Sequence, residues 1–240
     1  MNYSMDGFVY LLSLLPILLF WSVIFRIRPD ERNEMLVVGI FLGVVSVVSS
    51  YIWWTNDWWR PETITGTRVG IEDFILGFCG GGFMAVIYEI VMKKRRYRFR
   101  GKPDHPNLLA LFAIWTAIIV VLINIFEFTS FVASSIAFVV ATGIMLWRRR
   151  DLIVNSMFSG IATASSAFLF GYLPIIALAP EWVQNTYLYN NLSGITLIQI
   201  PIEEYVFWLL AGFLVGPSYE YWQHQRLRKL RTNFHMRRRP

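Results

Sequence analysis

The chain has 240 residues, of which 55% are hydrophobic and only 16% are charged, and its formal net charge is +6. This composition is typical of an integral membrane protein rather than of a soluble domain. The single cysteine, Cys79, excludes an intrachain disulfide and has no Cys or His neighbour at metal-ligand spacing, so no metal site is predicted.

Seven apolar runs are predicted to be membrane helices, because about 20 mostly apolar residues are needed to cross ~30 Å of hydrocarbon. In chain order the runs are Phe8–Phe25, Met35–Trp54, Glu72–Met92, Asn107–Phe126, Ser130–Trp147, Leu152–Ala179 and Ile200–Trp222. The sequence therefore predicts an all-α polytopic membrane bundle of about seven transmembrane helices. The triplet Cys79–Gly81 and the following Gly82 lie inside the third run and indicate close helix packing.

The basic residues fall in loops that this topology puts on one side of the membrane. Of the 22 positive charges, two lie in the other loops, Arg60 and Arg68. The positive-inside rule then predicts an outside N-terminus and a cytoplasmic C-terminus in the cell membrane. This placement favours contact with lipid headgroups, and no nucleic-acid partner is predicted.

An internal repeat relates the third and seventh predicted helices. Residues 71–74 (Ile-Glu-Asp-Phe) correspond to residues 202–205 (Ile-Glu-Glu-Tyr) at an offset of 131, and the same offset maps Tyr88-Glu89 onto Tyr219-Glu220. A fixed offset over two separate motifs indicates duplication. We predict one membrane domain with repeat one in residues 1–93, a basic loop and linking helix in 94–129, repeat two in 130–226 and a basic cytoplasmic tail in 227–240. The two repeats would be parallel, with three helices each.

Each repeat opens its last helix with two acids, Glu72 and Asp73 in the first and Glu203 and Glu204 in the second. A carboxylate at the edge of the hydrocarbon is costly, and such residues generally face the bundle interior and serve function. The alternative is a helix N-terminus whose acids interact with its dipole. Because the acidic pair occurs in both repeats, we favour a functional role over an interaction with the helix dipole. We expect Glu203 and Glu72 to face one cavity together.

The second copy, Ile200-Pro201-Ile202-Glu203-Glu204-Tyr205, resembles the Pro-x-Glu-(Glu/Asp) signature of the membrane-integral lycopene cyclases, whose two homologous halves occur as separate subunits or as one fused chain. The first copy, residues 70–74, resembles the same pattern but has Gly70 in place of the proline. The resemblance covers both halves, and most of its specificity lies in the two motifs.

This resemblance implies an enzyme of carotenoid biosynthesis that closes the acyclic ψ-ends of lycopene or a related carotene into ionone rings. Such an isomerisation is redox-neutral and needs a protonated carboxyl, a carboxylate and an apolar pocket. The resemblance points to Glu203 and Glu204 as acid and base in either order, with Glu72 and Asp73 equivalent in the first half. The expected pocket residues are Pro201, Tyr205, Phe74, Trp208, Asp57 and Trp58, of which the tryptophans could stabilise a cation.

No cofactor is expected, because the sequence has no glycine-rich dinucleotide fingerprint after a strand. The expected partners are membrane lipid and a lipophilic carotenoid, with a second copy of the chain or other carotenoid enzymes as further candidates. A transporter or proton-coupled carrier is the alternative, since parallel repeats and intramembrane acids also suit alternating access. A non-catalytic polyprenoid-binding subunit is the third reading. A retinal-binding photoreceptor is disfavoured, because each lysine falls in a predicted cytoplasmic segment.

Overall fold

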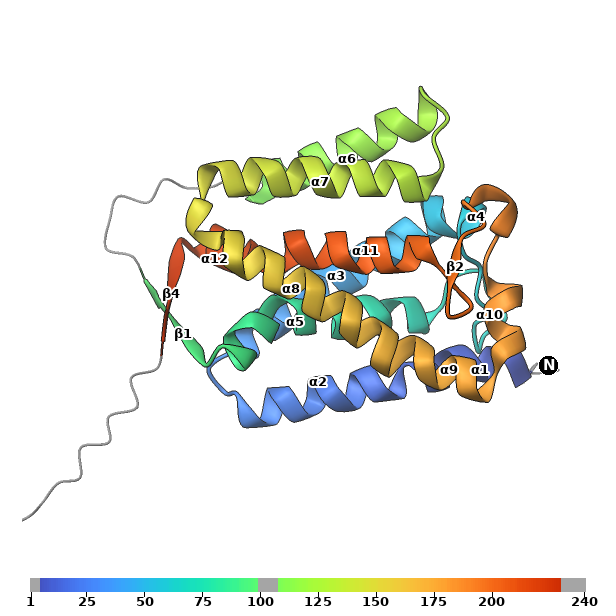
Figure 1. Cartoon of the computed structure of the whole chain (residues 1–240), viewed down its shortest axis with the longest axis horizontal. Helices are drawn as coiled ribbons and strands as arrows, with labels where there is room; N and C mark the ends of the chain where they lie inside the picture. Colours follow the sequence, from blue (N-terminus) through green and yellow to red (C-terminus); the bar gives the residue numbers. More distant parts are fainter. Residues whose placement is uncertain (1–4, 99–107, 230–240) are drawn as a thin grey trace, which may run out of the picture.

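The computed structural model describes residues 5–98 and 108–229 and shows an elongated bundle whose long helices run roughly side by side (Figure 1). Its longer helices are α2 (Leu15–Ile27), α3 (Arg32–Ser49), α5 (Ile71–Val91), α6 (Leu108–Asn124), α7 (Ser130–Arg148), α8 (Ile153–Ser166) and α11 (Ile202–Val215). The shorter helices are α1 (Met5–Ser13), α4 (Thr55–Asp57), α9 (Leu173–Leu178), α10 (Pro180–Thr186) and α12 (Ser218–Gln223). The prediction of an all-α fold is thus confirmed for most of the chain.

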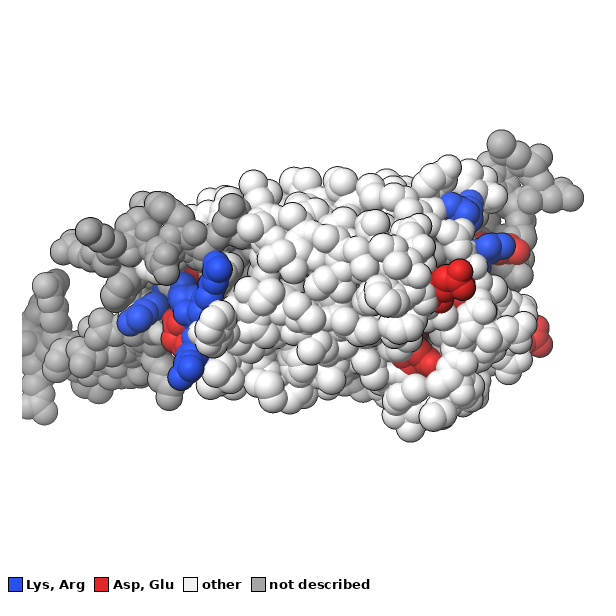
Figure 2. Space-filling model, turned by 90° about the horizontal axis from the view of Figure 1, so that it is seen from above, with Lys and Arg blue, Asp and Glu red and all other residues white. Residues whose placement is uncertain are grey.

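Five helical stretches of the described chain are long and apolar enough to cross a membrane, which confirms five of the seven predicted crossings by length and composition. They are Phe8–Ile27, Arg32–Asp57, Ile71–Val91, Ser130–Arg148 and Arg150–Leu178. The other two predicted crossings correspond to shorter helices: α6 has 17 residues and α11 has 14. The helix α11 is short because it ends before the Gly216-Pro217 step. On the face seen in Figure 2, charged side chains lie toward the two ends and a broad uncharged band lies between them. The chain is therefore a membrane protein, and the count of seven crossings stays a prediction.

Two of the spanning stretches contain a π-helical segment near one end of the bundle, which we call the outer end. The segment η1 (Ser50–Trp54) follows α3, and η3 (Ala167–Tyr172) separates α8 from α9. The sequence predicted one continuous helix over Leu152–Ala179. The prediction of a regular α-helix is wrong at Ala167, where the π-helical segment begins. Pro174, in the first turn of α9, cannot donate the backbone hydrogen bond of a regular helix. Wide turns of this kind are frequent at functional sites.

Close helix contacts build the core within each half of the chain. The helix α3 packs along α5, and α8 packs along α11. At Gly81 an added Cβ would lie 2.7 Å from the Leu42 side chain, so α3 and α5 approach too closely for any larger residue. The predicted close packing at this glycine run is confirmed.

The opposite, inner end of the bundle carries a two-stranded antiparallel ladder between β1 (Lys94–Arg98) and β4 (Gln225–Lys229) (Figure 1). Its central pair is Arg96 with Leu227, two positions that are 131 residues apart. The same offset relates the two acidic motifs. The two strands are therefore equivalent segments of the two halves, and the central residue of each strand pairs with its equivalent in the other. A second short ladder joins β2 (Thr196–Leu197) to β3 (Ile200–Pro201) at the outer end.

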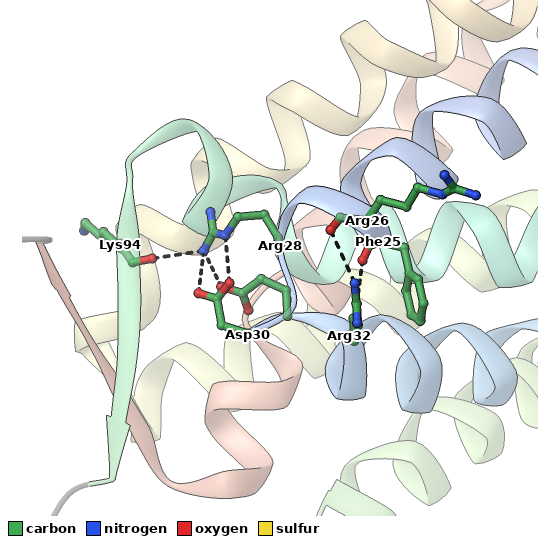
Figure 3. Close-up of polar contacts among 7 residues, drawn as sticks. Phe25, Arg26, Arg28, Asp30, Arg32 and Lys94 are labelled. Carbon is green, nitrogen blue, oxygen red and sulfur yellow. Dashed lines mark hydrogen bonds and ion pairs between the residues drawn. The ribbon is translucent and has the colours of Figure 1, made fainter.

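Arginine side chains close the α2–α3 connection beside β1 (Figure 3). The Arg28 guanidinium pairs with Asp30 at 3.1 Å and with Glu31 at 2.6 Å, and it donates to the Lys94 carbonyl at 3.5 Å. Arg32 donates to the Phe25 carbonyl at 2.7 Å. Two residues of the predicted basic loop, Arg100 and Lys102, lie outside the described residues, and so do residues 230–240 of the tail.

Candidate active site

The first acid of each pair ties down the loop that precedes its helix. The Ile64 backbone N–H donates to Glu72 Oε1 at 2.7 Å, and the Ser193 backbone N–H donates to Glu203 Oε1 at 2.6 Å. Both loops turn through a glycine in the left-handed region, Gly66 at φ +70° and Gly194 at φ +77°. Glu72 and Glu203 therefore hold equivalent structural positions in the two halves.

The second acids have different partners. Asp73 accepts hydrogen bonds from the Ser50 hydroxyl and from the Gly70 backbone N–H, both at 2.9 Å. Glu204 accepts one from the Tyr172 hydroxyl. The two donors Ser50 and Tyr172 both belong to the π-helical segments, the first residue of η1 and the last of η3. Both halves thus use an irregular turn to supply a hydroxyl to the second acid.

A proline explains why Glu204 is not held as Asp73 is. An acid at the third helical position commonly accepts a hydrogen bond from the N–H of the N-cap residue, and Asp73 does so with Gly70. The N-cap residue of α11 is Pro201, which has no N–H. Glu204 therefore has no capping donor to accept from, and its longer side chain reaches further into the bundle.

An apolar cavity of about 480 Å³ lies inside the bundle, and Glu204 is one of the residues that line it. Aromatic side chains from several helices line it, among them Trp54, Trp58, Phe207 and Trp208. It extends to Trp222, which is 18 residues further along the chain and so on the order of 25 Å away at about 1.5 Å per residue. Among the described residues that line the cavity, Glu204 has the one carboxyl group, and there is no Lys or Arg. The volume falls in the range of small-molecule sites.

The structure brings only part of the predicted site together. The expectation that Glu203 and Glu72 face the cavity is wrong, because their carboxylates turn to the loops and it is Glu204 that lines the cavity. Asp73 also stays outside the cavity lining and instead caps α5. Of the predicted pocket residues, Trp58 and Trp208 line the cavity.

The other four predicted pocket residues hold structural positions outside the cavity lining. The Asp57 carboxylate accepts from the Ser130 backbone N–H at 2.7 Å and so caps α7. Pro201 begins α11, and the Tyr205 hydroxyl donates to the Leu197 carbonyl at 2.9 Å. Phe74 packs on α3, where a Cβ at Gly43 would lie 2.7 Å from its ring.

Three tyrosines at the outer end of the cavity were missed by sequence reasoning, namely Tyr10, Tyr172 and Tyr187. Trp208 Nε1 donates to the Tyr172 hydroxyl at 3.0 Å, which fixes the phenol beside Glu204. Tyr187 follows α10, and burial raises its pKa well above the ordinary value, with the charge of Glu204 acting in the same direction. This phenol therefore stays protonated. One signal was available for Tyr172, because its predicted helix is too long for a single regular crossing.

Loops from both halves close the outer end over Glu204. The Arg60 backbone N–H donates to the Thr186 carbonyl at 2.7 Å, and the Leu188 N–H donates to the Trp58 carbonyl at 2.9 Å. Tyr10 packs edge-on against Trp59 with ring centroids 5.6 Å apart. Glu204 is 5% exposed beneath this cover, so bulk water has little access to the carboxyl group.

Comparison with known proteins identifies the family of the chain. A sequence model of the lycopene cyclase family matches residues 7–91 and 128–222, about three quarters of the chain. The chain belongs to the lycopene cyclase family. No significant match was found among curated proteins or among solved structures. Each matched segment contains one acidic pair, and membership of the lycopene cyclase family supports a function as a carotenoid cyclase in the membrane.

Proposed function

We propose that this protein closes the acyclic ψ-ends of lycopene or a related carotene into ionone rings by an acid-initiated, redox-neutral reaction. The observation that carries this proposal is a carboxyl group at the closed end of a long apolar cavity, in a chain of the lycopene cyclase family. An extended polyene fits a cavity on the order of 25 Å long whose lining is almost wholly apolar.

The reaction begins when a carboxylic acid transfers its proton to the terminal double bond of the substrate. The tertiary carbocation that forms is attacked by the next double bond along the chain, which creates the ring C–C bond and moves the positive charge to a ring carbon. A carboxylate then takes a proton from a neighbouring ring carbon, and the ring double bond forms. Of the four predicted acids Glu72, Asp73, Glu203 and Glu204, Glu204 is best placed to touch the substrate because it lines the cavity.

Aromatic rings around Glu204 suit a cationic intermediate. The Trp58 and Phe207 rings meet edge to face at 4.9 Å between centroids, and Trp54 meets Phe207 in the same way at 5.4 Å. Ring faces stabilise a positive charge by cation–π interaction, more strongly where water is excluded. The closed outer end also protects the cation from capture by water.

The substrate would enter from the bilayer between α2 and η3. Phe20 of α2 and Phe170 of η3 stack with centroids 5.4 Å apart, both line the cavity, and both are more than a third exposed. In a membrane such exposed apolar side chains face lipid tails, in which a carotene is dissolved. A movement of these two rings would connect the cavity with the bilayer.

The topology that we propose has seven crossings, an outside N-terminus and a cytoplasmic C-terminus. The basic ladder strands then lie at the cytoplasmic surface, and the acidic pairs lie at the outer end. The two halves form parallel three-helix repeats joined by α6, and the pairing of β1 with β4 at equivalent positions supports a two-fold relation between them.

Expression in a host that accumulates lycopene tests the proposal directly. The pigments would be extracted, separated by chromatography and identified by absorption and mass, because each ring shortens the conjugated system without changing the mass. Mono- or bicyclic carotene is the expected result. Unchanged lycopene in cells whose membranes contain the folded protein would overturn the proposal and favour a carrier or a non-catalytic polyprenoid-binding subunit.

A further inference from the structure

The two halves of this protein contribute unequally to the reaction that we propose above, and the inequality begins with the contacts of the four acids. Glu72 and Glu203 each accept a backbone N–H of a loop, and Asp73 accepts both a hydroxyl and the N–H of Gly70. Glu204 accepts from a side chain that itself lines the cavity, Tyr172. Of the four acids, Glu204 is the one that lines the cavity and so lies beside a substrate bound there.

We propose that Glu204 both gives the proton and takes it back, and that Tyr172 is the positioning residue that holds its carboxylate between the two transfers. This inference rests on the proposed function. In the sequence-based assignment, the acid and the base are two different residues. In this inference, the two oxygens of one carboxyl group, that of Glu204, serve both roles.

The chemistry of ring closure permits one group to act twice. For a ring double bond formed next to the new C–C bond, the carbon that receives the proton and the carbon that loses one are both bonded to the same former cationic carbon. At ordinary C–C lengths and angles those two carbons are about 2.5 Å apart. A carboxyl group held at contact distance from one is therefore near the other, and its two oxygens can serve the two carbons.

The proton balance closes on Glu204 alone. Its O–H bond breaks as a C–H bond forms at the terminal double bond, which leaves a carboxylate and a carbocation. After the ring bond forms, the C–H bond at the neighbouring ring carbon breaks and the O–H bond of Glu204 is restored. The product is an isomer of the substrate, and no oxidant, reductant or external base takes part.

Tyr172 stabilises the intermediate stage of this cycle. When Glu204 is a carboxylate, the Tyr172 hydroxyl donates to its Oε2 atom, and the phenol is itself fixed by the N–H of Trp208 at 3.0 Å. A hydrogen bond to a charged acceptor is stronger than one to a neutral acceptor. Because no Lys or Arg appears among the described residues of the cavity lining, this hydroxyl supplies the polar contact that a cation would otherwise give.

The experiment uses the full-length protein reconstituted in lipid vesicles that contain lycopene, with ring formation followed by chromatography. Glu204→Gln is expected to lower turnover at least about 100-fold, the usual effect of losing a general acid. Glu203→Gln and Glu72→Gln keep an acceptor oxygen for their loop N–H groups, and turnover is expected to stay within about threefold of wild type. Glu181→Gln, at an exposed outer position, is the matched control.

Tyr172→Phe tests the positioning residue and is expected to lower kcat about tenfold with KM unchanged, since the phenyl ring still fills its place in the cavity. The matched control is Tyr51→Phe in the π-helical segment of the first half, where Tyr51 is 64% exposed. Rates are compared per amount of monodisperse protein. Glu204→Asp keeps the acid but shortens its reach, and it is expected to retain more activity than Glu204→Gln.

The outcomes separate the inference from the function on which it rests. A wild-type protein that forms no ring would overturn the proposed function. A wild-type protein that forms rings, together with a Glu203→Gln or Glu72→Gln variant as inactive as Glu204→Gln, would overturn the one-carboxyl cycle. Wild-type kcat in Tyr172→Phe, or a raised KM at unchanged kcat, would overturn the role of Tyr172.

Discussion

Asp73 and Glu204 occupy equivalent positions in the two halves and accept hydrogen bonds from different donors. Asp73 is held by Ser50 and by the backbone of Gly70, and it caps α5. Glu204 accepts from the Tyr172 hydroxyl and has no hydrogen bond from its N-cap residue, because Pro201 has no N–H. The difference between the two acids follows from the proline of the second motif. Pro201 has no N–H to donate, so Glu204 does not cap its helix as Asp73 does, and it lines the cavity instead.

The largest effect that sharpens this comparison is expected from Asp73→Ala. The substitution leaves the Ser50 hydroxyl and the Gly70 N–H without their acceptor inside the protein, at a cost of about 2–4 kcal/mol. The free energy of unfolding, measured in mixed micelles with increasing denaturing detergent, should fall by that amount. Turnover per folded molecule should change less than about threefold, and loss of turnover at full stability would show that the first half takes part in the chemistry.

Helix packing provides a second test, in which the second half is perturbed away from its acids. A Cβ at Gly160 would lie 2.0 Å from the Phe213 ring and 2.7 Å from the Leu209 carbonyl, so Gly160→Ala must separate α8 from α11. Overpacking of this kind costs about 1–3 kcal/mol. Gly143→Ala is the control, since no atom lies within 4 Å of its added Cβ. Thermal unfolding of the purified variants should show the difference, and equal stabilities would contradict the close crossing.

Pro201→Ala restores the missing N–H and should move Glu204 toward the position that Asp73 has in the first half. We expect turnover to fall about tenfold, equivalent to about 1.4 kcal/mol, while stability is kept or slightly raised by the new cap. Pro180→Ala, at the exposed start of α10, is the matched control. Turnover equal to that of wild type would mean that the absent donor does not determine where Glu204 lies.

The smallest effect is expected at the inner end, far from both acidic pairs. Burial raises the pKa of Glu31 from 4.5 to about 7, against the opposing charge of Arg28. The folded protein therefore binds this proton more tightly than the unfolded chain, so its contribution to stability is present below about pH 4.5 and is lost as the pH rises to about 7. Allowing for screening at the membrane edge, we expect at most about 1 kcal/mol.

The Glu31→Gln side chain cannot lose a proton. Between pH 5 and pH 8 the free energy of unfolding of this variant should therefore fall less than that of wild type, by at most about 1 kcal/mol. Its ring-forming activity should follow the same pH profile as wild type, because Glu31 lies at the opposite end of the bundle from Glu204. A variant whose stability keeps the wild-type pH dependence would contradict the assignment of this proton to Glu31.

Much of the fold and part of the site could be predicted from the sequence. Apolar runs of spanning length predicted five helices well, because length and hydropathy are local properties. The acidic pairs were found because they recur at a fixed offset. What failed was the direction of each side chain. Neighbouring residues on a helix point about 100° apart, so periodicity alone could not decide between Glu203 and Glu204.

The tyrosines of the site were missed for a different physical reason. Tyr172 owes its position to the π-helical segment η3, where the backbone departs from regular geometry within an apolar run. Tyr187 reaches the cavity from a loop that pairs with residues of the other half, a long-range contact with no local pattern. In contrast, Pro201 is visible in the sequence, and a proline has no N–H. This could have indicated that Glu204 does not cap its helix.

The ladder of β1 and β4 has a consequence for how such a chain could have arisen. Its central pair joins a residue to its own counterpart in the other half, and the strands run antiparallel about that point. That is an isologous contact, the kind by which two identical subunits close a symmetric dimer. A single half made alone would present the same edge to a second copy of itself. The ladder is therefore a contact by which two separate half-length subunits could associate at this end of the bundle.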